Sequence, residues 1–119
     1  MKILIVGSGS IGLRHLKNVL ELINKVEITI VSRNKSTTDF NGISVVNDIA
    51  TAFINKEFYD AAIIATPTSL HLENCFDLIE HGIKKIYVEK PLSNNLNDVD
   101  KLEKLAQSLN VSIYVGYDL

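Results

Sequence analysis

Short apolar runs alternate with longer segments of helical period along the chain. The apolar runs are too short for helices and predict buried strands. The predicted strands are Ile3–Val6, Val26–Val31, Ile43–Val46, Ala61–Ala65, Ile86–Val88 and Val111–Val115. Between them, apolar residues spaced three and four apart predict helices over residues 11–23, from Asn47 or Asp48 to Asn55, over Ser69–His81 and from Asn95 to Leu109. Asn47 or Asp48 and Asn95 are the predicted N-terminal caps of two of these helices, and Gly82 is predicted to end the helix before it.

Strands that alternate with helices along the chain indicate repeated β-α-β units. Because the apolar runs are continuous rather than alternating, we expect a parallel sheet that is covered on both faces. Right-handed crossovers then make a doubly wound α/β fold the simplest topology, with about six parallel strands between two layers of helices. In such sheets a ligand binds outside the carboxyl ends of the strands, where the sequence places its candidate functional residues.

Composition narrows the class of protein. The chain has 119 residues, 46% of them hydrophobic, with 12 Lys and Arg against 14 Asp and Glu. This length suits one domain, and the near-neutral charge gives no electrostatic case for nucleic acid or an anionic membrane. Every apolar run is shorter than a membrane span, and the single cysteine, Cys75, falls on an apolar helix face, so we expect a cytoplasmic protein without disulfides. The lone Cys and the scattered His have no metal-ligand spacing, so we expect no metal site.

The first predicted strand runs directly into Gly7-Ser8-Gly9-Ser10-Ile11-Gly12, which has the spacing GxGxxG. Between a strand and a helix, this spacing is the fingerprint of a dinucleotide-binding turn. Gly7 would allow the tight turn, Gly9 would let a pyrophosphate approach the backbone, and Gly12 would let the helix pack closely on the strand. The free N–H groups of the helix N-terminus would bind the phosphates. The alternative is a structural turn that binds no ligand.

The second predicted strand ends in Val31-Ser32-Arg33, without the carboxylate that usually accepts a hydrogen bond from the adenosine ribose of NAD. An arginine beside a hydroxyl suits a 2′-phosphate, because the guanidinium binds phosphate through two parallel hydrogen bonds. We therefore predict that Ser32 and Arg33 favour NADP over NAD. Use of both cofactors stays open, and the alternative for Arg33 is a solvated loop residue.

Two further clusters follow the fourth and fifth predicted strands. Thr66-Pro67-Thr68 precedes His71, and Glu89-Lys90 precedes Pro91. From spacing alone, the first cluster indicates turn and helix-cap chemistry, with His71 as an ordinary surface histidine. A lysine after a strand is usually solvated, yet the position of Lys90 at a carboxyl end makes it a candidate to face a nicotinamide or a substrate hydroxyl.

Three motifs follow one another along the chain: Gly7–His15, Ala65–His71 and Glu89–Leu92. In type and order they resemble the motifs of the Gfo/Idh/MocA oxidoreductases, whose nucleotide-binding domain is a Rossmann fold. Residues Tyr114–Leu119 resemble the family's strand before its second domain. The resemblance implies hydride transfer between NADP or NAD and a hydroxyl or carbonyl of a sugar, polyol or sugar nucleotide. It implies that Lys90 is the catalytic residue that assists proton transfer. It also implies cofactor contacts from Ala65, Thr66, Pro67, Thr68, His71, Glu89 and Lys90.

The resemblance also bears on domain organisation. Members of the family have a second domain that carries substrate contacts and the oligomer interface. We therefore expect residues 1–119 to be an isolated dinucleotide-binding domain, either a piece of a longer protein or a truncated gene product, that is inactive alone. The full-length protein would be a homo-oligomer.

Two other classes of function are compatible with a doubly wound fold. A non-catalytic module that senses a dinucleotide would need phosphate and ribose contacts but no proton donor, so Lys90 favours the enzyme. A methyltransferase-like or nucleotide-sugar-binding domain is disfavoured by the complete glycine motif.

Overall fold

The computed structural model describes residues 1–7, 17, 21, 25–32, 43–54 and 57–116. Within them, six strands form a sheet in the order β3-β2-β1-β4-β5-β6, and all neighbouring strands are parallel. The strands are β1 (Lys2–Val6), β2 (Glu27–Val31), β3 (Ser44–Val46), β4 (Ala61–Ile64), β5 (Lys85–Glu89) and β6 (Ser112–Gly116). The described helices are α2 (Ile49–Ala52), α3 (His71–Glu80) and α4 (Leu96–Ser108), with a 3₁₀ turn, η2, at Thr68–Leu70. The prediction of a doubly wound parallel α/β sheet is confirmed.

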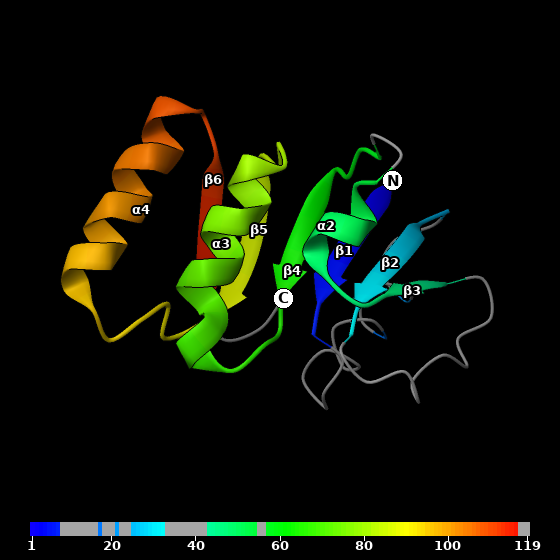
Figure 1. Ribbon diagram of the computed structural model, residues 1–119, viewed down its shortest axis with the longest axis horizontal. Helices are drawn as coiled ribbons and strands as arrows, with labels where there is room; N and C mark the ends of the chain where they lie inside the picture. The colour runs from blue at the N-terminus through cyan, green and yellow to red at the C-terminus, as the bar shows by residue number, and fades with distance from the viewer. Residues whose placement is uncertain (8–16, 18–20, 22–24, 33–42, 55–56, 117–119) are drawn as a thin grey trace.

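Strand β1 lies inside the sheet and is hydrogen-bonded to β2 on one side and to β4 on the other (Figure 1). Its side chains alternate between two apolar clusters, with Ile3 and Ile5 in one and Leu4 and Val6 in the other. All four side chains are at most 4% exposed. Burial on both faces explains why β1 is a continuous apolar run, as expected for a parallel sheet covered on both sides.

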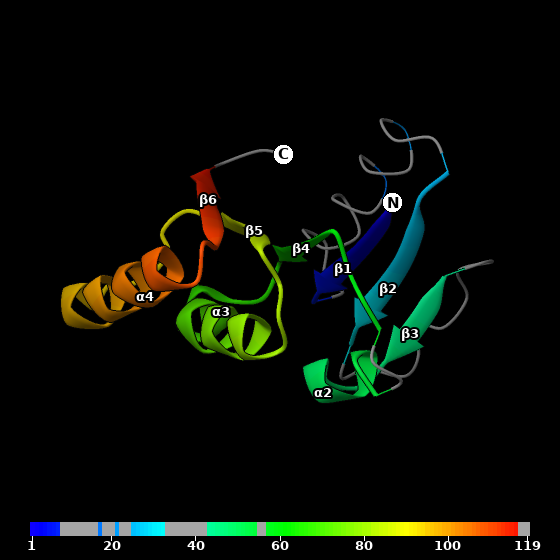
Figure 2. The ribbon, with the colours of Figure 1, turned by 90° about the horizontal axis from the view of Figure 1, so that it is seen from above.

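Helices α2, α3 and α4 lie on one face of the sheet, where they contribute to the cluster that contains Leu4 and Val6 (Figure 2). The predicted helix over residues 11–23 falls largely outside the described residues. Within that range the structure describes Lys17 and Glu21, and both are helical. None of the helices in the described part of the chain has the length and apolar content to cross a membrane.

Two helices begin at side-chain caps that the sequence predicts. The side chain of Asp48 accepts a hydrogen bond from the Thr51 N–H at 2.7 Å, and that of Asn95 accepts from the Asp98 N–H at 3.2 Å. Hydrogen bonds from the hydroxyl and backbone of Thr51 hold the pKa of Asp48 below its ordinary value. Both caps satisfy N–H groups that the first helical turn leaves without partners.

The C-terminus of α3 is a glycine turn, also as predicted. Gly82 has a φ of +93°, its N–H donates to the Ile79 carbonyl at 3.0 Å, and the Ile83 N–H donates to the Leu78 carbonyl at 3.1 Å. This pair of bonds is the Schellman arrangement, in which a glycine adopts the conformation that other residues resist.

Two predicted helices differ from the observed ones. The segment predicted as a helix from Ser69 begins as the 3₁₀ turn η2, because Pro67 is extended and the Leu70 N–H closes a tight turn on the Pro67 carbonyl at 2.9 Å. Helix α2 is shorter than predicted, because the Phe53 N–H turns back to the Ala50 carbonyl at 3.1 Å and ends the helix.

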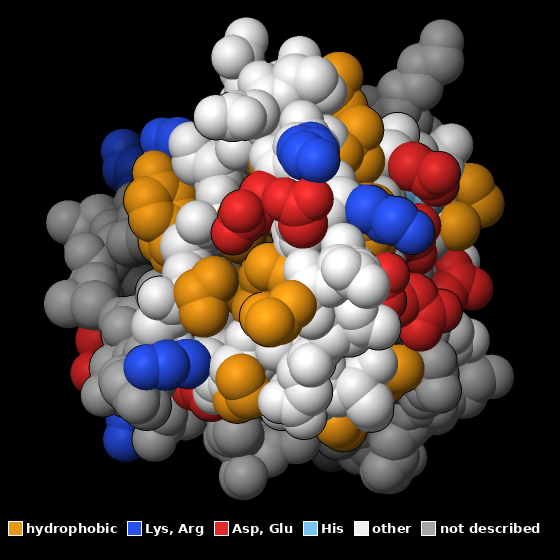
Figure 3. Space-filling model, turned by 90° about the vertical axis from the view of Figure 1, so that its left-hand side faces the viewer, with side chains coloured by type: hydrophobic (Ala, Val, Ile, Leu, Met, Phe, Trp, Pro, Cys, Tyr) orange, Lys and Arg blue, Asp and Glu red, His pale blue; other side chains and the backbone are white. Residues whose placement is uncertain are grey.

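Most strand ends differ from the predicted ones by one residue, and the two edge strands, β3 and β6, are less buried than predicted. Strand β6 is an edge strand, and its Tyr114 and Val115 are 46% and 45% exposed. Tyr114 stacks on its cross-strand partner Tyr87 with ring centroids 4.7 Å apart. Figure 3, viewed from the α4 end, shows exposed hydrophobic side chains between Lys, Asp and Glu. The expectation that all apolar runs are buried on both faces is wrong at this edge.

The packing of α3 can be tested at Cys75, the single cysteine of the chain. Its side chain is 0% exposed, and burial raises the pKa of the thiol to about 12. Because the thiolate is the reactive form, we expect iodoacetamide at mildly alkaline pH to leave the native protein unmodified and to alkylate the urea-unfolded protein fully. Intact mass measures the outcome, and rapid alkylation of the native protein would contradict the observed packing.

Candidate functional site

The carboxyl ends of β1, β2, β4 and β5 bring four candidate segments to the same edge of the sheet (Figure 1). The strand order reverses between β1 and β4, where connections leave toward opposite sides and a ligand crevice forms in sheets of this kind. One further backbone hydrogen bond anchors the start of each segment. In each bond a backbone N–H donates to a backbone carbonyl oxygen: Gly7 to Val31 at 2.9 Å, Ala65 to Val6 at 2.8 Å, Ser32 to Val46 at 2.8 Å and Lys90 to Gly116 at 3.0 Å.

Gly7, which directly follows β1, lies close to the backbone of the segment after β4. It has a φ of +109°, and a Cβ atom at this position would stand 2.8 Å from the Ala65 carbonyl oxygen and 3.1 Å from the Thr66 nitrogen. The backbone conformation and the close approach each require glycine. The remainder of the glycine motif, Ser8, Gly9, Ser10, Ile11 and Gly12, lies outside the described residues.

Ser32 directly follows β2 and is 3% exposed. Its N–H is bonded to β3, so the end of β2 is fixed by the neighbouring strand. This places a hydroxyl-bearing residue where the sequence predicts the adenosine end of a dinucleotide. Arg33 lies outside the described residues, and its pairing with a 2′-phosphate stays a prediction.

Thr66, in the segment after β4, is held by a residue that the sequence interpretation missed. Its hydroxyl donates to Asn74 Oδ1 at 2.6 Å. Neither η2 nor α3 has a side-chain hydrogen bond at its cap position, so the helix-cap interpretation of Thr66-Pro67-Thr68 is wrong. Asn74 is half-buried on α3, and no pattern in the sequence pairs it with Thr66.

His71 begins α3 and is 3% exposed, so its interpretation as a surface histidine is wrong. Its Nε2 lies 2.8 Å from the Thr66 carbonyl oxygen and its Nδ1 lies 3.1 Å from the Pro91 carbonyl oxygen. A helical spacing of four residues from the buried Cys75 could have indicated that His71 faces inward. The imidazole is thus engaged by backbone on both ring nitrogens.

Glu89 and Lys90 stand at the end of β5, where Glu89 is half-buried and Lys90 is exposed. The peptide bond between Lys90 and Pro91 is cis. The described candidates therefore share one edge of the sheet, as the order of motifs along the sequence predicts.

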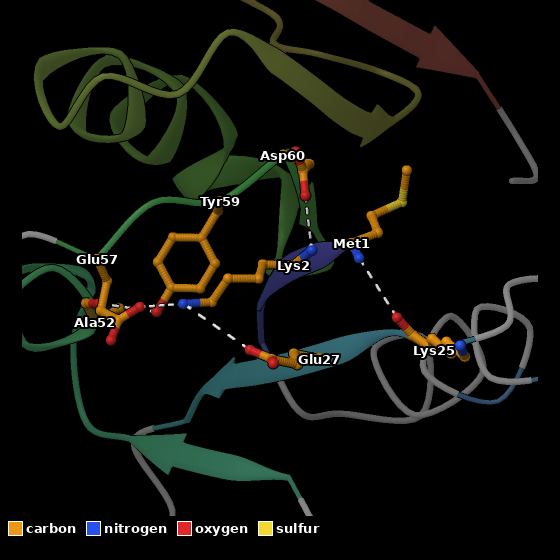
Figure 4. A network of polar contacts seen from close by, with 8 residues as sticks. All are labelled: Met1, Lys2, Lys25, Glu27, Ala52, Glu57, Tyr59 and Asp60. Atoms are coloured by element: carbon orange, nitrogen blue, oxygen red, sulfur yellow. Dashed lines mark hydrogen bonds and ion pairs between the residues drawn. The ribbon is translucent and has the colours of Figure 1, made fainter.

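A separate polar network lies at the opposite edge, where the strands begin (Figure 4). The Lys2 ammonium contacts the Glu57 carboxylate, lies 4.0 Å from Glu27 and stands 5.7 Å from the centroid of the Tyr59 ring. The hydrogen bond with Glu57 raises the pKa of Lys2. The backbone N–H of Lys2 donates to Asp60 at 2.7 Å. This network joins β1 to its neighbours and shares no residue with the candidate site.

The strand order, with a glycine turn after β1 at the point where that order reverses, defines a dinucleotide-binding α/β domain. Its described residues fit such a ligand, because Gly7 leaves the turn without a side chain, hydroxyl-bearing residues follow β2 and β4, and a cation follows β5. The chain belongs to the Gfo/Idh/MocA oxidoreductase family with an NAD-binding Rossmann fold, whose sequence model matches residues 1–117.

Individual relatives agree with this family. The chain is 31% identical over 98 residues to inositol 2-dehydrogenase of Renibacterium salmoninarum, covering 78% of this chain and 29% of the relative. It is 27% identical over 118 residues to scyllo-inositol 2-dehydrogenase (NAD(+)) of Bacillus subtilis, covering 95% and 34%. The fold matches the WlbA dehydrogenase of Bordetella pertussis, solved with NADH and UDP-GlcNAcA, with a TM-score of 0.83 at 20% identity over 97% of this chain and 34% of that one. The chain spans about a third of the length of these relatives.

The contact between Gly7 and Ala65 can be tested by substitution with alanine. Gly7→Ala must adopt a positive φ and also displace the Ala65 carbonyl, so we expect a loss of about 2–5 kcal/mol in the free energy of unfolding. Urea unfolding followed by circular dichroism measures this loss.

Gly82→Ala is the matched control, because Gly82 also has a positive φ of +93° but a Cβ there would meet no atom within 4 Å. We expect this variant to lose only about 1–2 kcal/mol, the cost of the backbone conformation alone. Equal losses in the two variants would show that the contact after β4 does not constrain Gly7.

Proposed function

We propose that this chain is the nucleotide-binding part of a dehydrogenase that transfers a hydride between a nicotinamide dinucleotide and a sugar, polyol or sugar-nucleotide substrate. The observation that carries the proposal is the common edge at which Gly7, Ser32, Thr66 and Lys90 follow four neighbouring strands. An edge of this kind is where doubly wound sheets bind dinucleotides.

Each segment of the edge has a role in the proposal. Residues 7–12 bind the pyrophosphate, Ser32 and Arg33 bind the adenosine ribose, and residues 65–68 line the path toward the nicotinamide. Glu89 and Lys90 stand at the nicotinamide end. The bound nicotinamide supplies or accepts the hydride. Lys90 holds or moves the proton of the substrate hydroxyl, a task that an amine at the mouth of a crevice can perform.

The substrate class in this proposal follows the relatives. Two of them are named as inositol dehydrogenases, and the WlbA structure contains a sugar nucleotide. Polyols and sugar rings share secondary hydroxyls, whose oxidation releases one hydride and one proton. A single lysine at the nicotinamide end meets the need for a proton acceptor in every such substrate.

We further propose that NADP is preferred to NAD. The segment after β2 is Ser32-Arg33, without an Asp or Glu to accept a hydrogen bond from a free ribose 2′-hydroxyl. An arginine at this position pairs with a 2′-phosphate instead.

Titration calorimetry with NADPH and NADH tests the function and the cofactor preference together. We expect the protein to bind both, with NADPH tighter, and Arg33→Ala to weaken NADPH about tenfold or more while leaving NADH nearly unchanged. Equal loss for both cofactors would argue against a 2′-phosphate contact. Absence of binding to either cofactor would contradict the proposed function.

Lys90→Ala tests the proton-transfer role in the full-length protein. We expect kcat for a sugar or polyol substrate to fall about a hundredfold, the usual contribution of one acid–base group, with a much smaller change in cofactor KM. Steady-state reduction of NADP or NAD, followed by absorbance, measures both constants.

Lys85→Ala provides the control, because Lys85 is an exposed lysine at the opposite end of the same strand. It should leave kcat unchanged. An unchanged kcat in Lys90→Ala as well would remove Lys90 from the mechanism.

A further inference from the structure

One buried imidazole connects the two loops on either side of the nicotinamide end of the proposed site. His71 is 3% exposed, and its ring nitrogens lie 2.8 Å from the Thr66 carbonyl and 3.1 Å from the Pro91 carbonyl. Thr66 belongs to the loop after β4 and Pro91 to the loop after β5. The ring therefore lies between two backbone segments that are distant along the chain.

The chemistry of these contacts is specific to a ring with N–H groups. A carbonyl oxygen only accepts hydrogen bonds, so each contact is a hydrogen bond when the facing ring nitrogen carries the proton. The ring itself is buried, whereas Thr66 is half-buried and Pro91 is exposed, so it is a ring N–H without a protein acceptor that would be costly. An apolar ring of the same size would supply no donor to either carbonyl. A side chain at position 71 must therefore supply a hydrogen-bond donor, and filling the same volume is not enough.

Both ends of this connection lead directly to site residues. The backbone of Thr66 is the segment that approaches Gly7, where a Cβ would stand 3.1 Å from the Thr66 nitrogen. Pro91 is joined to Lys90, whose own N–H donates to the Gly116 carbonyl at 3.0 Å. The backbone of Lys90 is therefore bonded to β6 through its own N–H, and the carbonyl of the next residue, Pro91, lies within hydrogen-bond distance of the His71 ring.

We propose that His71 is a positioning residue, which fixes the loop of Lys90 relative to the loop of Thr66 and so holds the Lys90 ammonium beside the nicotinamide. The inference rests on the proposed function, because that function places the nicotinamide near Lys90. In this proposal His71 contacts the backbone of the two loops and makes no direct contact with the dinucleotide.

The charge of the nicotinamide ring provides a readout that a purely structural residue would not change. The oxidised ring is positively charged and the reduced ring is neutral, so a nearby ammonium disfavours the oxidised form relative to the reduced form. The ratio of the two affinities therefore reports where the Lys90 ammonium stands. A general loss of stability would weaken the binding of both forms alike.

The experiment compares four variants with the wild type in the full chain. His71→Phe keeps a ring but removes both ring nitrogens and with them the N–H donor, His71→Gln retains one amide donor, and Lys90→Ala is combined with His71→Phe as a double variant. His81→Phe is the matched control, because His81 ends the same helix and its Nδ1 lies 2.9 Å from the Asp77 carbonyl. Calorimetry measures the affinities for oxidised and reduced dinucleotide, and hydrogen exchange measures the protection of the Lys90 N–H.

We expect Lys90→Ala to lower the preference for the reduced form by about five- to tenfold, and His71→Phe to lower it by about threefold or more in the same direction. The double variant should match Lys90→Ala, because a residue that acts through Lys90 has no further effect once Lys90 is gone. His71→Gln should recover part of the preference. The Lys90 N–H should exchange faster in His71→Phe, and His81→Phe should change neither measurement.

An unchanged affinity ratio in both His71 variants overturns the inference, as does equal weakening of the oxidised and reduced forms. Additive effects in the double variant overturn it as well, because they show that His71 acts independently of Lys90. A wild-type protein that binds neither form contradicts the proposed function itself, and the role of His71 toward the nicotinamide falls with it. The exchange measurement then decides separately whether His71 holds the loop.

Discussion

The position of β1 inside the sheet is the constraint on which the rest of the molecule depends. A strand that pairs on both sides and is buried on both faces must be apolar throughout, and Ile3, Leu4, Ile5 and Val6 are. The strand order also reverses beside β1, so Gly7, which directly follows this strand, lies at the position where sheets of this kind form a ligand crevice. Gly7 is the residue where the two requirements meet, since it ends the buried strand and passes close to the backbone after β4.

The two edges of the sheet are held together by different interactions. At the amino edge, side-chain ion pairs around Lys2 join neighbouring strands, and their exposure limits each to a modest contribution. At the carboxyl edge, the loops are held by backbone hydrogen bonds and by the partly buried contacts of Thr66 and His71. The loops at this edge are thus held by backbone groups and by side chains that are partly or fully buried.

Much of the fold could be predicted from the sequence, because many of its determinants are interactions between residues that are close along the chain. The apolar run of β1, the Asn95 cap and the glycine at the end of α3 each act within a few residues, and each is observed where the sequence places it. The exposure of β6 could not be predicted, since a strand becomes an edge only through the order of the whole sheet. The contacts of His71 were missed for a similar reason: the Pro91 carbonyl lies twenty positions away along the chain.

The alternation of β1 side chains between two cores also restricts how such a protein can change in length during evolution. A single inserted residue within the strand would exchange the two sets of side chains and displace Gly7 from its place against Ala65. Insertions and deletions are therefore tolerated in the connections and not in the strand. The fold can consequently persist while the sequence diverges, as the match to WlbA with a TM-score of 0.83 at 20% identity shows.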